Sequence, residues 1–428
     1  MLTQRARDPR ERARRVLPGG YGRSSYMVGP GAPYAIRGEG CRLWDDTGRV
    51  VIDCNNNFAS LIHGHAHPAI VAAAFRAIED GSAFGLPNER ELDHAETLLE
   101  RLPNADAVRY VNSGTEAVMT ALRIARAHTG RSRCILTDRA YHGFSDIALA
   151  TGDERSRRGL PPGVMRDTIL LGHNDTAALI DTIERKGADV AAVLIDLMPN
   201  RPGLLPAEPE HVRTLVQLCH AHGIVIVVDE VISFRLGPTG RSPLYGLEPD
   251  LVILGKLIGG GFPVGAVAGR GEIMHELDPR RATGLDHGGT FSGNPVTMAA
   301  GLAALDLFDD AEIRRLNELG DRVRGSLEAP LAAAGWEVRG SGSLLRPWPV
   351  APGDDRATIY RALWWAAYRR GLLLNPTGLV ALSTPMEQAV ADEIVDVISS
   401  AVDDVATGWR PPADGGRVEP AGRSSRAR

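Results

Sequence analysis

The middle of the chain alternates between short apolar runs and longer amphipathic stretches. Runs rich in Val, Ile and Leu occupy residues 108–111, 134–136, 191–195, 224–228 and 251–254. Stretches with helical spacing lie between several of these runs, at 115–128, 176–185 and 209–222. Continuous apolar strands that alternate with helices are typical of a mostly parallel sheet covered by helices on both faces. The pattern therefore predicts an α/β fold for this region.

The two ends of the chain show shorter elements. Strand candidates near the N-terminus are 34–37, 41–44 and 50–53, and helical patterns follow at 69–79 and 89–102. After Pro295 we expect a long helix at 296–308, a further helical region, short strands at 336–338 and 372–374, and a last helix at 387–405. The tail from Gly408 is rich in Gly, Pro, Arg and Ser, and we expect it to be disordered.

Length and charge restrict the class of protein. A chain of 428 residues can bury a large core and form two domains, or one large domain with a satellite. Its net charge of −5 provides no basic surface for nucleic acid. The first fifteen residues are charged with no apolar stretch behind them, and no run approaches 18 apolar residues, which argues against a secretory signal or a membrane span. We expect a cytoplasmic protein without nucleic-acid or membrane partners.

The four cysteines are Cys41, Cys54, Cys134 and Cys219, and their spacing does not match a metal site. Cys54 and Cys134 fall within apolar, strand-like runs. We therefore expect buried free thiols in a reducing compartment.

His63, His65 and His67 alternate along a short segment and resemble a metal cluster. No nearby carboxylate or cysteine completes a tetrahedral ligand set. We expect these histidines to serve structural hydrogen bonding, and we expect no metal.

Lysine is almost absent from the chain. Of its 48 lysines and arginines, only Lys186 and Lys256 are lysines. Arginine stays protonated and cannot form an imine, so it cannot replace a lysine whose amine must react. Lys256 ends an apolar run and precedes a glycine cluster, Gly259–Gly261, which makes it a candidate nucleophile. Lys186 lies at a predicted helix C-terminus, where a surface charge is favourable.

A candidate anion site lies where a predicted strand meets a helix, at Ser113-Gly114-Thr115. Free backbone N–H groups and the positive end of a helix would point there at a phosphate. An ordinary N-cap by Ser113, with Glu116 completing a capping box, explains the same residues, and both interpretations can hold at once.

Two further segments follow predicted strands. Asp229 comes directly after the apolar run 224–228, where it could hold a metal, act as a base or pair with a cationic ring nitrogen. A phosphate-loop Mg²⁺ site is a weak competitor, because the Gly-Lys pair at 255–256 is followed by Leu257. Tyr141, which His142 follows, could stack on a planar ligand, although such a pair more often serves loop packing.

A phosphate site, an aromatic side chain, an acid and a reactive lysine at strand ends are what pyridoxal 5′-phosphate (PLP) requires. The order of its motifs along the chain resembles that of the class III (subgroup II) aminotransferases of fold type I. It is similar to their branch of glutamate-1-semialdehyde 2,1-aminomutases and β-amino-acid (β-phenylalanine) aminotransferases. The resemblance covers about residues 15 to 405, and it rests on motifs at 112–117, 141–143, 229–231, 254–256 and 289–295.

The resemblance implies a large domain with a mostly parallel seven-stranded sheet and a smaller α+β domain. Residues 61–295 would form the large PLP-binding domain. Residues 1–60 and 296–407 would build the small domain, and 408–428 would be the disordered tail. It also implies a homodimer with a shared active site.

Site roles follow from the same resemblance. Lys256 would carry the cofactor as an imine (Schiff base), and Asp229 would pair with the ring nitrogen. Tyr141 would stack on the ring with His142 beside it, and Val231 would pack on the opposite face.

The phosphate would be bound by Ser113, Gly114 and Thr115, and Thr290 would reach the phosphate of the neighbouring subunit. Arg23 matches an arginine that grips a substrate carboxylate in some β-amino-acid aminotransferases. Asn57 and Phe58 would line a partly polar substrate pocket.

Three departures from the family concern the substrate. Asp196-Leu197 replaces the usual Glu-Pro, and Arg201 stands where an Asn is common. The segment from Asp229 to Arg235 is shortened, and 55–58 reads Asn-Asn-Asn-Phe where aminomutases have Trp-Gly. Arg201 could grip a second acid or lie in solvent. These departures count against a housekeeping aminomutase.

The resulting hypothesis is an aminotransferase that moves an amino group from an amino acid donor to a keto or semialdehyde acceptor, by a ping-pong route through pyridoxamine phosphate. An aminomutase acting within one molecule is the alternative, and a decarboxylase or epimerase would use the same residues. A catalytically silent regulatory protein is disfavoured because Lys256 and Asp229 are both present. A dinucleotide oxidoreductase is disfavoured because no Gly-x-Gly-x-x-Gly follows the early strands.

Overall fold

A seven-stranded sheet forms the centre of the computed structural model, which describes residues 8–29, 31–351 and 355–411. The strand order is β4-β10-β9-β8-β7-β5-β6. The strands are β4 (Ala107–Val111), β5 (Arg133–Thr137), β6 (Thr168–Leu171), β7 (Val190–Ile195), β8 (Val225–Asp229), β9 (Leu251–Gly255) and β10 (Gly265–Gly269). Only β10 runs antiparallel to its two neighbours. The predicted α/β fold with a mostly parallel seven-stranded sheet is confirmed.

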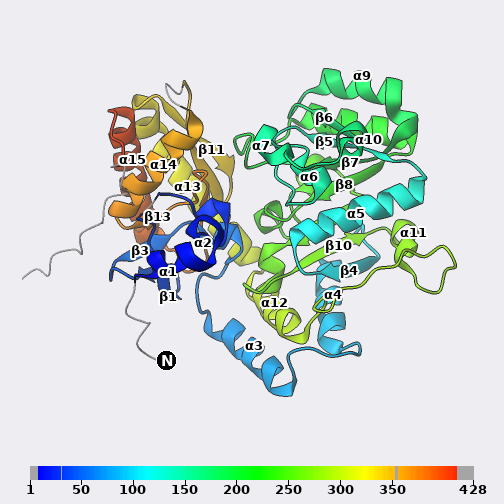
Figure 1. The fold of residues 1–428 in the computed structure, drawn as a ribbon, viewed down its shortest axis with the longest axis horizontal. Helices are drawn as coiled ribbons and strands as arrows, with labels where there is room; N and C mark the ends of the chain where they lie inside the picture. The colour runs from blue at the N-terminus through cyan, green and yellow to red at the C-terminus, as the bar shows by residue number, and fades with distance from the viewer. Residues whose placement is uncertain (1–7, 30, 352–354, 412–428) are drawn as a thin grey trace, which may run out of the picture.

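Helices cover both faces of this sheet (Figure 1). Helix α5 (Gly114–Thr129) packs in one hydrophobic cluster with Cys134 and Leu136 of β5. Helices α9 (Thr176–Lys186) and α10 (Pro209–His222) belong to another cluster, which contains Ile135 of the same strand. Successive side chains of a strand point to opposite faces, so a wholly apolar run fits a strand that is buried on both sides.

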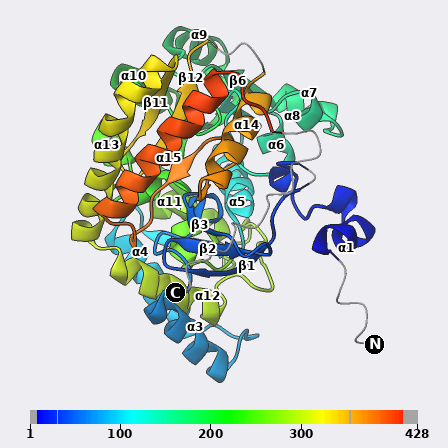
Figure 2. The same cartoon turned by 90° about the vertical axis from the view of Figure 1, so that its left-hand side faces the viewer.

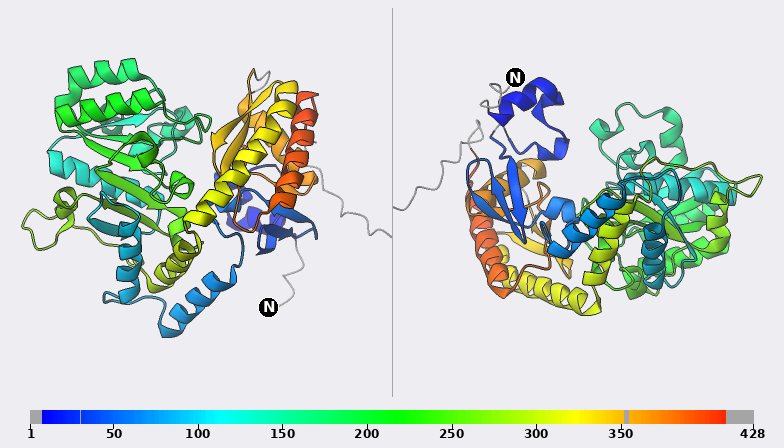
Figure 3. Two further views of the ribbon diagram at one scale, coloured as in Figure 1. Left: turned by 180° about the vertical axis from the view of Figure 1, so that it is seen from behind. Right: turned by 90° about the horizontal axis from the view of Figure 1, so that it is seen from below.

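Two smaller sheets lie together in the other half of the molecule (Figures 1 and 3). One has the order β1-β2-β3-β13 and the other β11-β12-β14. Their strands are β1 (Ala35–Glu39), β2 (Arg42–Asp45), β3 (Val50–Asp53), β11 (Trp336–Ser341), β12 (Leu344–Pro349), β13 (Leu372–Leu373) and β14 (Val380–Ala381). Strand β13 pairs in parallel with β3, so segments about 320 residues apart form one sheet.

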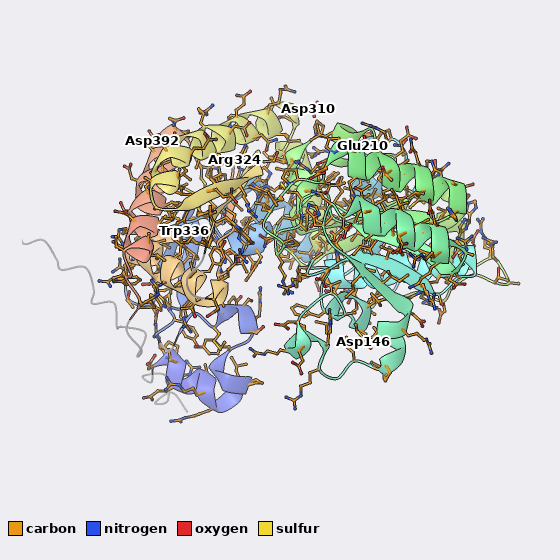
Figure 4. All side chains as sticks on the ribbon, turned by 90° about the horizontal axis from the view of Figure 1, so that it is seen from above. Asp146, Glu210, Asp310, Arg324, Trp336 and Asp392 are labelled. Carbon is orange, nitrogen blue, oxygen red and sulfur yellow. The ribbon has the colours of Figure 1, made fainter. Side chains whose placement is uncertain are left out.

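Helices α13 (Asp310–Ala333), α14 (Arg356–Arg369) and α15 (Gln388–Ala406) cover these sheets, as Figure 2 shows. The buried face of α14 is tied to the N-terminal segment. The indole N–H of Trp365 donates to the carbonyl of Val28 (2.7 Å), and the Tyr368 hydroxyl donates to Asp45 Oδ2 (2.6 Å). Side chains fill the space between the two halves of the molecule in Figure 4, where Glu210 of α10 and Asp392 of α15 mark opposite halves.

Helices α3 (Pro68–Asp80), α4 (Glu89–Glu100) and α12 (Pro295–Leu307) pack together at one end of the molecule. One face of α3 is buried against α12, with Ile70 and Ala74 in the shared cluster. The opposite face exposes Val71, Phe75 and Ile78. Helix α3 projects from the body of the molecule in Figures 1 and 2.

The remaining helical elements are short. The α-helices among them are α1 (Pro9–Val16), α2 (Asn56–Ala59), α6 (Asp146–Leu149), α7 (Glu154–Arg157), α8 (Pro162–Asp167) and α11 (Gly271–Met274). The 3₁₀ turns are η1 (Pro18–Gly20), η2 (Ser24–Tyr26), η3 (Gly187–Asp189), η4 (Ser233–Leu236), η5 (Ser242–Tyr245), η6 (Lys256–Gly259) and η7 (His275–Leu277).

The structure adds four strands that the sequence pattern did not predict, β6, β10, β12 and β14. All four cysteines are buried and free, as expected. Most of the tail from Gly408 lies outside the described residues. Within the described part of the chain, no helix is both long enough and apolar enough to cross a bilayer.

Candidate active site

Lys256 follows the last residue of β9 directly. Every residue of that strand is buried, and the lysine begins the turn η6 with a positive φ of 51°. A left-handed conformation costs a residue with a side chain roughly 1–2 kcal/mol, so the surrounding structure must hold it there. Burial lowers the pKa of Lys256, and the charges of Asp229 and Asp196 offset part of that effect. Burial therefore shifts the equilibrium of this amine toward its neutral, nucleophilic form.

Asp229 is the buried last residue of β8, with 5 % of its surface exposed. His142, on the loop after β5, places its Nδ1 atom 2.7 Å from Asp229 Oδ2, and the backbone N–H of Val231 donates to Oδ1 (3.0 Å). An ionised carboxylate can accept about four hydrogen bonds, so Asp229 keeps capacity for a protonated ring nitrogen. Nε2 of His142 is buried without a partner among the described residues.

Asp196 is a second acidic residue of the site, and its sequence drew notice only as a departure from the family. It comes directly after β7 and is 5 % exposed. The backbone N–H of Met198 donates to its Oδ1 (2.9 Å). Burial, followed by the charge of Asp229, raises the pKa of Asp196 to about 7. Like Asp229, Asp196 stands at the carboxyl end of an apolar strand. This sequence pattern could have identified Asp196 as a site residue too.

The predicted N-cap is present at the start of α5. Ser113 Oγ accepts the backbone N–H of Glu116 (3.2 Å). The Glu116 carboxylate accepts the N–H of Asn112 and not that of Ser113, so the expected capping box closes one residue earlier. The backbone N–H groups of Gly114 and Thr115 have no acceptor inside the helix and are free for an anion.

The loop after β5 lies against this helix start. Gly143 has a φ of 97°, and a Cβ there would be 2.2 Å from Thr115 Oγ1, so only glycine allows the approach. The backbone N–H of Phe144 donates to the same Oγ1 (3.3 Å). The loop thereby brings Tyr141, whose ring is 40 % exposed, toward the N-terminus of α5.

Val231 lies close to two of the glycines around the site. A Cβ at Gly114 would be 3.3 Å from the Val231 side chain, and one at Gly255 would be 3.4 Å away. A lysine, an acid for a ring nitrogen, unpaired N–H groups at a helix start and an exposed aromatic ring thus surround one region. This donor set, with the unpartnered Nε2 of His142, fits a ligand with an aldehyde, a ring nitrogen and a phosphate.

Thr290 is exposed, and its side chain forms no hydrogen bond with the residues that the structure describes. The preceding Gly289 approaches Asn112, since a Cβ at Gly289 would be 3.5 Å from Asn112 Nδ2. Phe291, the next residue along, is 61 % exposed.

The three predicted substrate residues lie together. Arg23 Nη1 donates to Asn57 Oδ1 (3.4 Å), and Arg23 Cζ is 5.9 Å from the centre of the Phe58 ring. Asn57 and Phe58 belong to the short helix α2, whose four residues Asn56–Ala59 all have positive φ, at 47°, 47°, 60° and 66°. A left-handed turn of four residues with side chains is unusual, because such residues normally adopt this conformation singly.

Hydrogen bonds hold this left-handed turn in place. Asp53 Oδ1 accepts the N–H groups of Asn55 and Asn56, both at 2.8 Å. Asn55 Oδ1 accepts the N–H of Phe58 (3.0 Å) and Nδ2 of Asn375 (3.1 Å).

The same turn is also connected to the C-terminal strands and to the segment that carries Lys256. Asn56 Nδ2 donates to the carbonyl of Ala381 (2.7 Å). Leu61 Cδ2 would be 2.9 Å from a Cβ at Gly261, so the residues after the turn reach the glycine cluster that follows Lys256.

Two of the three histidines of the motif make the structural hydrogen bonds that were expected, whereas Nδ1 of His67 is buried without a partner among the described residues. His63 pairs through its two ring nitrogens with Thr384 Oγ1 (3.0 Å) and the carbonyl of Ala304 (2.9 Å). His65 Nε2 lies 2.7 Å from Oδ2 of Asp53, the residue that also holds the left-handed turn through its Oδ1. Lys186 is the exposed last residue of α9, as predicted.

Comparison with known proteins agrees with this geometry. The family model described as aminotransferase class-III matches residues 30–402. A glutamate-1-semialdehyde 2,1-aminomutase of Desulforudis audaxviator (strain MP104C) is 39 % identical over 407 residues, covering 90 % of this chain and 93 % of that protein.

Solved structures are similarly close. An omega-transaminase from Sphaerobacter thermophilus is 40 % identical with a TM-score of 0.89, covering 93 % of this chain and 97 % of its own. A β-phenylalanine aminotransferase from Variovorax paradoxus is 32 % identical with a TM-score of 0.85, covering 91 % and 92 %. A structure described as a transaminase with PLP bound is 37 % identical with a TM-score of 0.90, covering 95 % and 99 %. The chain therefore belongs to the class III aminotransferases, which are PLP-dependent enzymes.

Proposed function

We propose that the protein is an aminotransferase that moves an amino group from an amino acid donor to a keto or semialdehyde acceptor by a ping-pong route. The observation that carries this proposal is the convergence of Lys256, whose pKa burial lowers, with the Asp229–His142 pair at neighbouring strand ends. This arrangement suits proton transfer at the carbon next to the substrate nitrogen.

When bound, PLP supplies an aldehyde that holds the substrate nitrogen covalently and a ring that accepts the electron pair left after proton removal. The Nζ atom of Lys256 would take the proton from the substrate carbon and deliver it to the carbon that the aldehyde of PLP supplies, so that the amino group could stay with the cofactor. Asp229 holds a proton on the ring nitrogen, and His142 and the Val231 N–H fix the orientation of its carboxylate.

The other predicted residues position the reacting groups. The N–H groups of Gly114 and Thr115, with the Ser113 hydroxyl, bind the phosphate at the positive end of α5. Tyr141 would pack on one face of the ring and Val231 on the other. We assign the substrate carboxylate to Arg23, with Asn57 and Phe58 forming the adjacent wall.

Borohydride reduction of the PLP-loaded protein tests the cofactor site. We expect a pyridoxyl adduct on Lys256 and none on Lys186, the other lysine of the chain. A protein that stays colourless with PLP, or an adduct confined to Lys186, would contradict the proposed site.

Steady-state kinetics test the reaction itself. A ping-pong enzyme gives parallel double-reciprocal lines when donor and acceptor are both varied, and the donor alone converts the cofactor stoichiometrically. Absence of both results with a broad set of donors, in a protein that holds PLP, would contradict transamination.

A second candidate is an aminomutase, favoured by the 39 % identity to a glutamate-1-semialdehyde 2,1-aminomutase over 90 % of the chain. It would use the same residues and retain the intermediate, which depends on closure of the site. Turnover of glutamate 1-semialdehyde without any acceptor, at a rate above that of two-substrate transamination, would favour this alternative.

We further propose a cytoplasmic homodimer with a shared active site. The exposed stripe Val71, Phe75 and Ile78 has the i, i+4, i+7 spacing of a helix face that packs against another protein, and Phe291 is exposed beside Thr290. Four buried free thiols suit a reducing compartment.

Mixing two inactive variants tests the shared site. If Thr290 serves the neighbouring subunit, dimers formed from Lys256→Ala and Thr290→Ala chains contain one intact site. Random pairing should then restore about a quarter of the wild-type activity per dimer. No gain on mixing two variants that exchange subunits would contradict a shared site.

A further inference from the structure

Arg201 lies over the aromatic ring that we assign to the cofactor. Its Cζ atom is 4.6 Å from the centre of the Tyr141 ring, and its side chain is exposed. It forms no ion pair or hydrogen bond with any residue that the structure describes. A guanidinium stacked on a ring keeps its N–H donors available in its own plane. Arg201 is therefore positioned to bind an acid at the site.

The loop that carries Arg201 is held on both sides of the residue. The carbonyl of Asn200 accepts a hydrogen bond from the buried Arg346, and Asn200 Nδ2 donates to Thr377 Oγ1 (3.5 Å). Met198 and Leu204 are fully buried in a cluster with Ala59 of the left-handed turn. The backbone at Arg201 is thus fixed although its side chain is free, which reduces the entropy lost on binding.

A chain of hydrogen bonds joins this loop to the residues around Arg23. Thr377 donates through its N–H (2.9 Å) and its hydroxyl (2.8 Å) to Asn375 Oδ1. Asn375 in turn donates to Asn55 Oδ1 (3.1 Å), which also holds the N–H of Phe58. The Arg201 loop and the turn that contacts Arg23 therefore form one connected structure.

Both guanidinium groups act on the same aromatic residue. Burial raises the pKa of Tyr141, Arg201 and Arg23 each lower it, and Asp229 raises it. The hydrogen bonds that Asp153 Oδ1 accepts from the N–H and the hydroxyl of Ser156 lower the pKa of Asp153, and the charge of Arg201 lowers it further. Arg201, which stacks on the Tyr141 ring, and Arg23 thus both place positive charge near Tyr141.

We propose that Arg201 is a second acid-binding residue, and that a natural donor or acceptor carries two carboxylates, one bound at Arg23 and the other at Arg201. The inference rests on the proposed function, because it names the substrate class of the same site. Arginine suits this task, since its planar fork can bind a carboxylate through two hydrogen bonds.

A matched pair of donors isolates the second carboxylate. Glutamate and 2-aminopentanoate have the same carbon chain and differ only in the distal acid. We expect the wild-type enzyme to prefer glutamate in kcat/KM, and Arg201→Gln to lower the glutamate to 2-aminopentanoate ratio about 10- to 100-fold. Arg201→Lys should restore part of the ratio. The control Arg155→Gln, which removes an exposed arginine on nearby α7, should leave the ratio unchanged.

A second pair of donors tests whether the substrate carries its amine on the α or the β carbon. The β-amino acids 3-aminopentanedioate and 3-aminopentanoate differ by the same acid group. A fall of the ratio in Arg201→Gln for either pair supports the proposal and indicates whether the donor is an α- or a β-amino acid. An unchanged ratio for both pairs would overturn it.

Binding without reaction separates this inference from the proposed function. Glutarate has two carboxylates and pentanoate has one, and neither has an amine. Calorimetric titration of the PLP-loaded protein should show tighter binding of glutarate, and Arg201→Gln should remove the difference. Equal affinities in the wild-type protein, or a difference that survives in Arg201→Gln, would overturn the role of Arg201. If no donor is transaminated, the proposed function fails while this titration still tests Arg201.

Discussion

The cofactor end and the substrate end of the proposed active site are assembled in different ways. Asp229 and Lys256 stand where neighbouring parallel strands end, and the phosphate site opens the helix α5 that packs on the same sheet. The substrate end consists of loops from the N-terminal segment, the Arg201 loop and residues 375–381. Sheet topology brings the first set together, whereas individual hydrogen bonds bring the second together.

This difference has a functional meaning. Side chains at adjacent strand ends keep their spacing as long as the sheet exists, which suits chemistry that all substrates share. Loops can change residue by residue without disturbing the sheet, which suits substrate choice. The departures from the family at 55–58 and at 201 lie at this end, whereas the shortened segment 229–235 begins at Asp229 of the cofactor end.

The strongest test of the cofactor end is Lys256→Ala. We expect turnover to fall by more than about 1000-fold, because the amine that moves the proton is lost. The absorbance of the PLP-loaded protein near its visible maximum should disappear as well. Lys186→Ala removes the other lysine and should leave both measurements unchanged. Substantial residual transamination in Lys256→Ala would break the assignment of the cofactor end.

Asp229→Asn should have the next largest effect. Without the carboxylate charge, the ring nitrogen loses its proton, and we expect the half-reaction with a donor to slow about 100- to 1000-fold. Asp250→Asn is a matched control at the opposite end of β9, where Asp250 accepts the N–H of Ile226 (2.8 Å). Stopped-flow absorbance measures both variants, and equal effects would show that the loss at Asp229 is structural.

At the substrate end, Asn55→Ala removes the oxygen that accepts hydrogen bonds from the Phe58 N–H and from Asn375 Nδ2. We expect KM for the donor to rise about tenfold and the free energy of unfolding to fall by about 2 kcal/mol, because buried donors are left unpaired. Absorbance of the bound cofactor should not change. Asn317→Ala also removes two hydrogen bonds, to Leu236 and Ser343, and should cost similar stability without raising KM. A loss of PLP binding in Asn55→Ala would contradict the separation of the two ends.

Asp196 lies at a strand end and also begins the Arg201 loop, so it stands between the cofactor end and the substrate end of the site. Its pKa is raised from 3.8 to about 7 in the folded protein, so ionisation opposes folding as the pH rises through this range. Asp196→Asn stays neutral. Between pH 5 and pH 8 it should gain about 2 kcal/mol of stability relative to the wild type. Urea denaturation of the protein without PLP at the two pH values measures this gain, and parallel pH profiles would contradict the raised pKa.

The fold could be predicted where side chains carried a strong pattern. Helix α10 and strand β3 have the predicted bounds, because caps, turns and periodicity all agree there. Strand β10 was not predicted, since its sequence Gly-Ala-Val-Ala-Gly has little β-propensity. Its small residues are required by close packing: a Cβ at Gly265 would be 2.1 Å from the carbonyl oxygen of Ser113. The reason for this composition lies in a contact that the sequence does not display.

The same distinction applies within the site. Asp229 and Lys256 could be proposed from local sequence, because a polar residue after a buried strand has a known place in an α/β sheet. The pairing of His142 with Asp229 spans 87 residues, and that of Asn55 with Asn375 spans 320. No local pattern indicates such pairs. The role proposed for Arg201 depends on its stacking on the Tyr141 ring, which only the folded structure reveals.

The left-handed turn at 56–59 also bears on the order of folding. Its backbone is unfavourable in isolation, and its partners Asn375 and Ala381 are among the last parts of the chain to be synthesised. The sheet with Asp229 and Lys256 needs none of these residues for its strand pairing. We therefore expect mutations in the turn to accelerate unfolding while leaving the refolding rate nearly unchanged, so that the enzyme acquires its specificity in the final stage of folding.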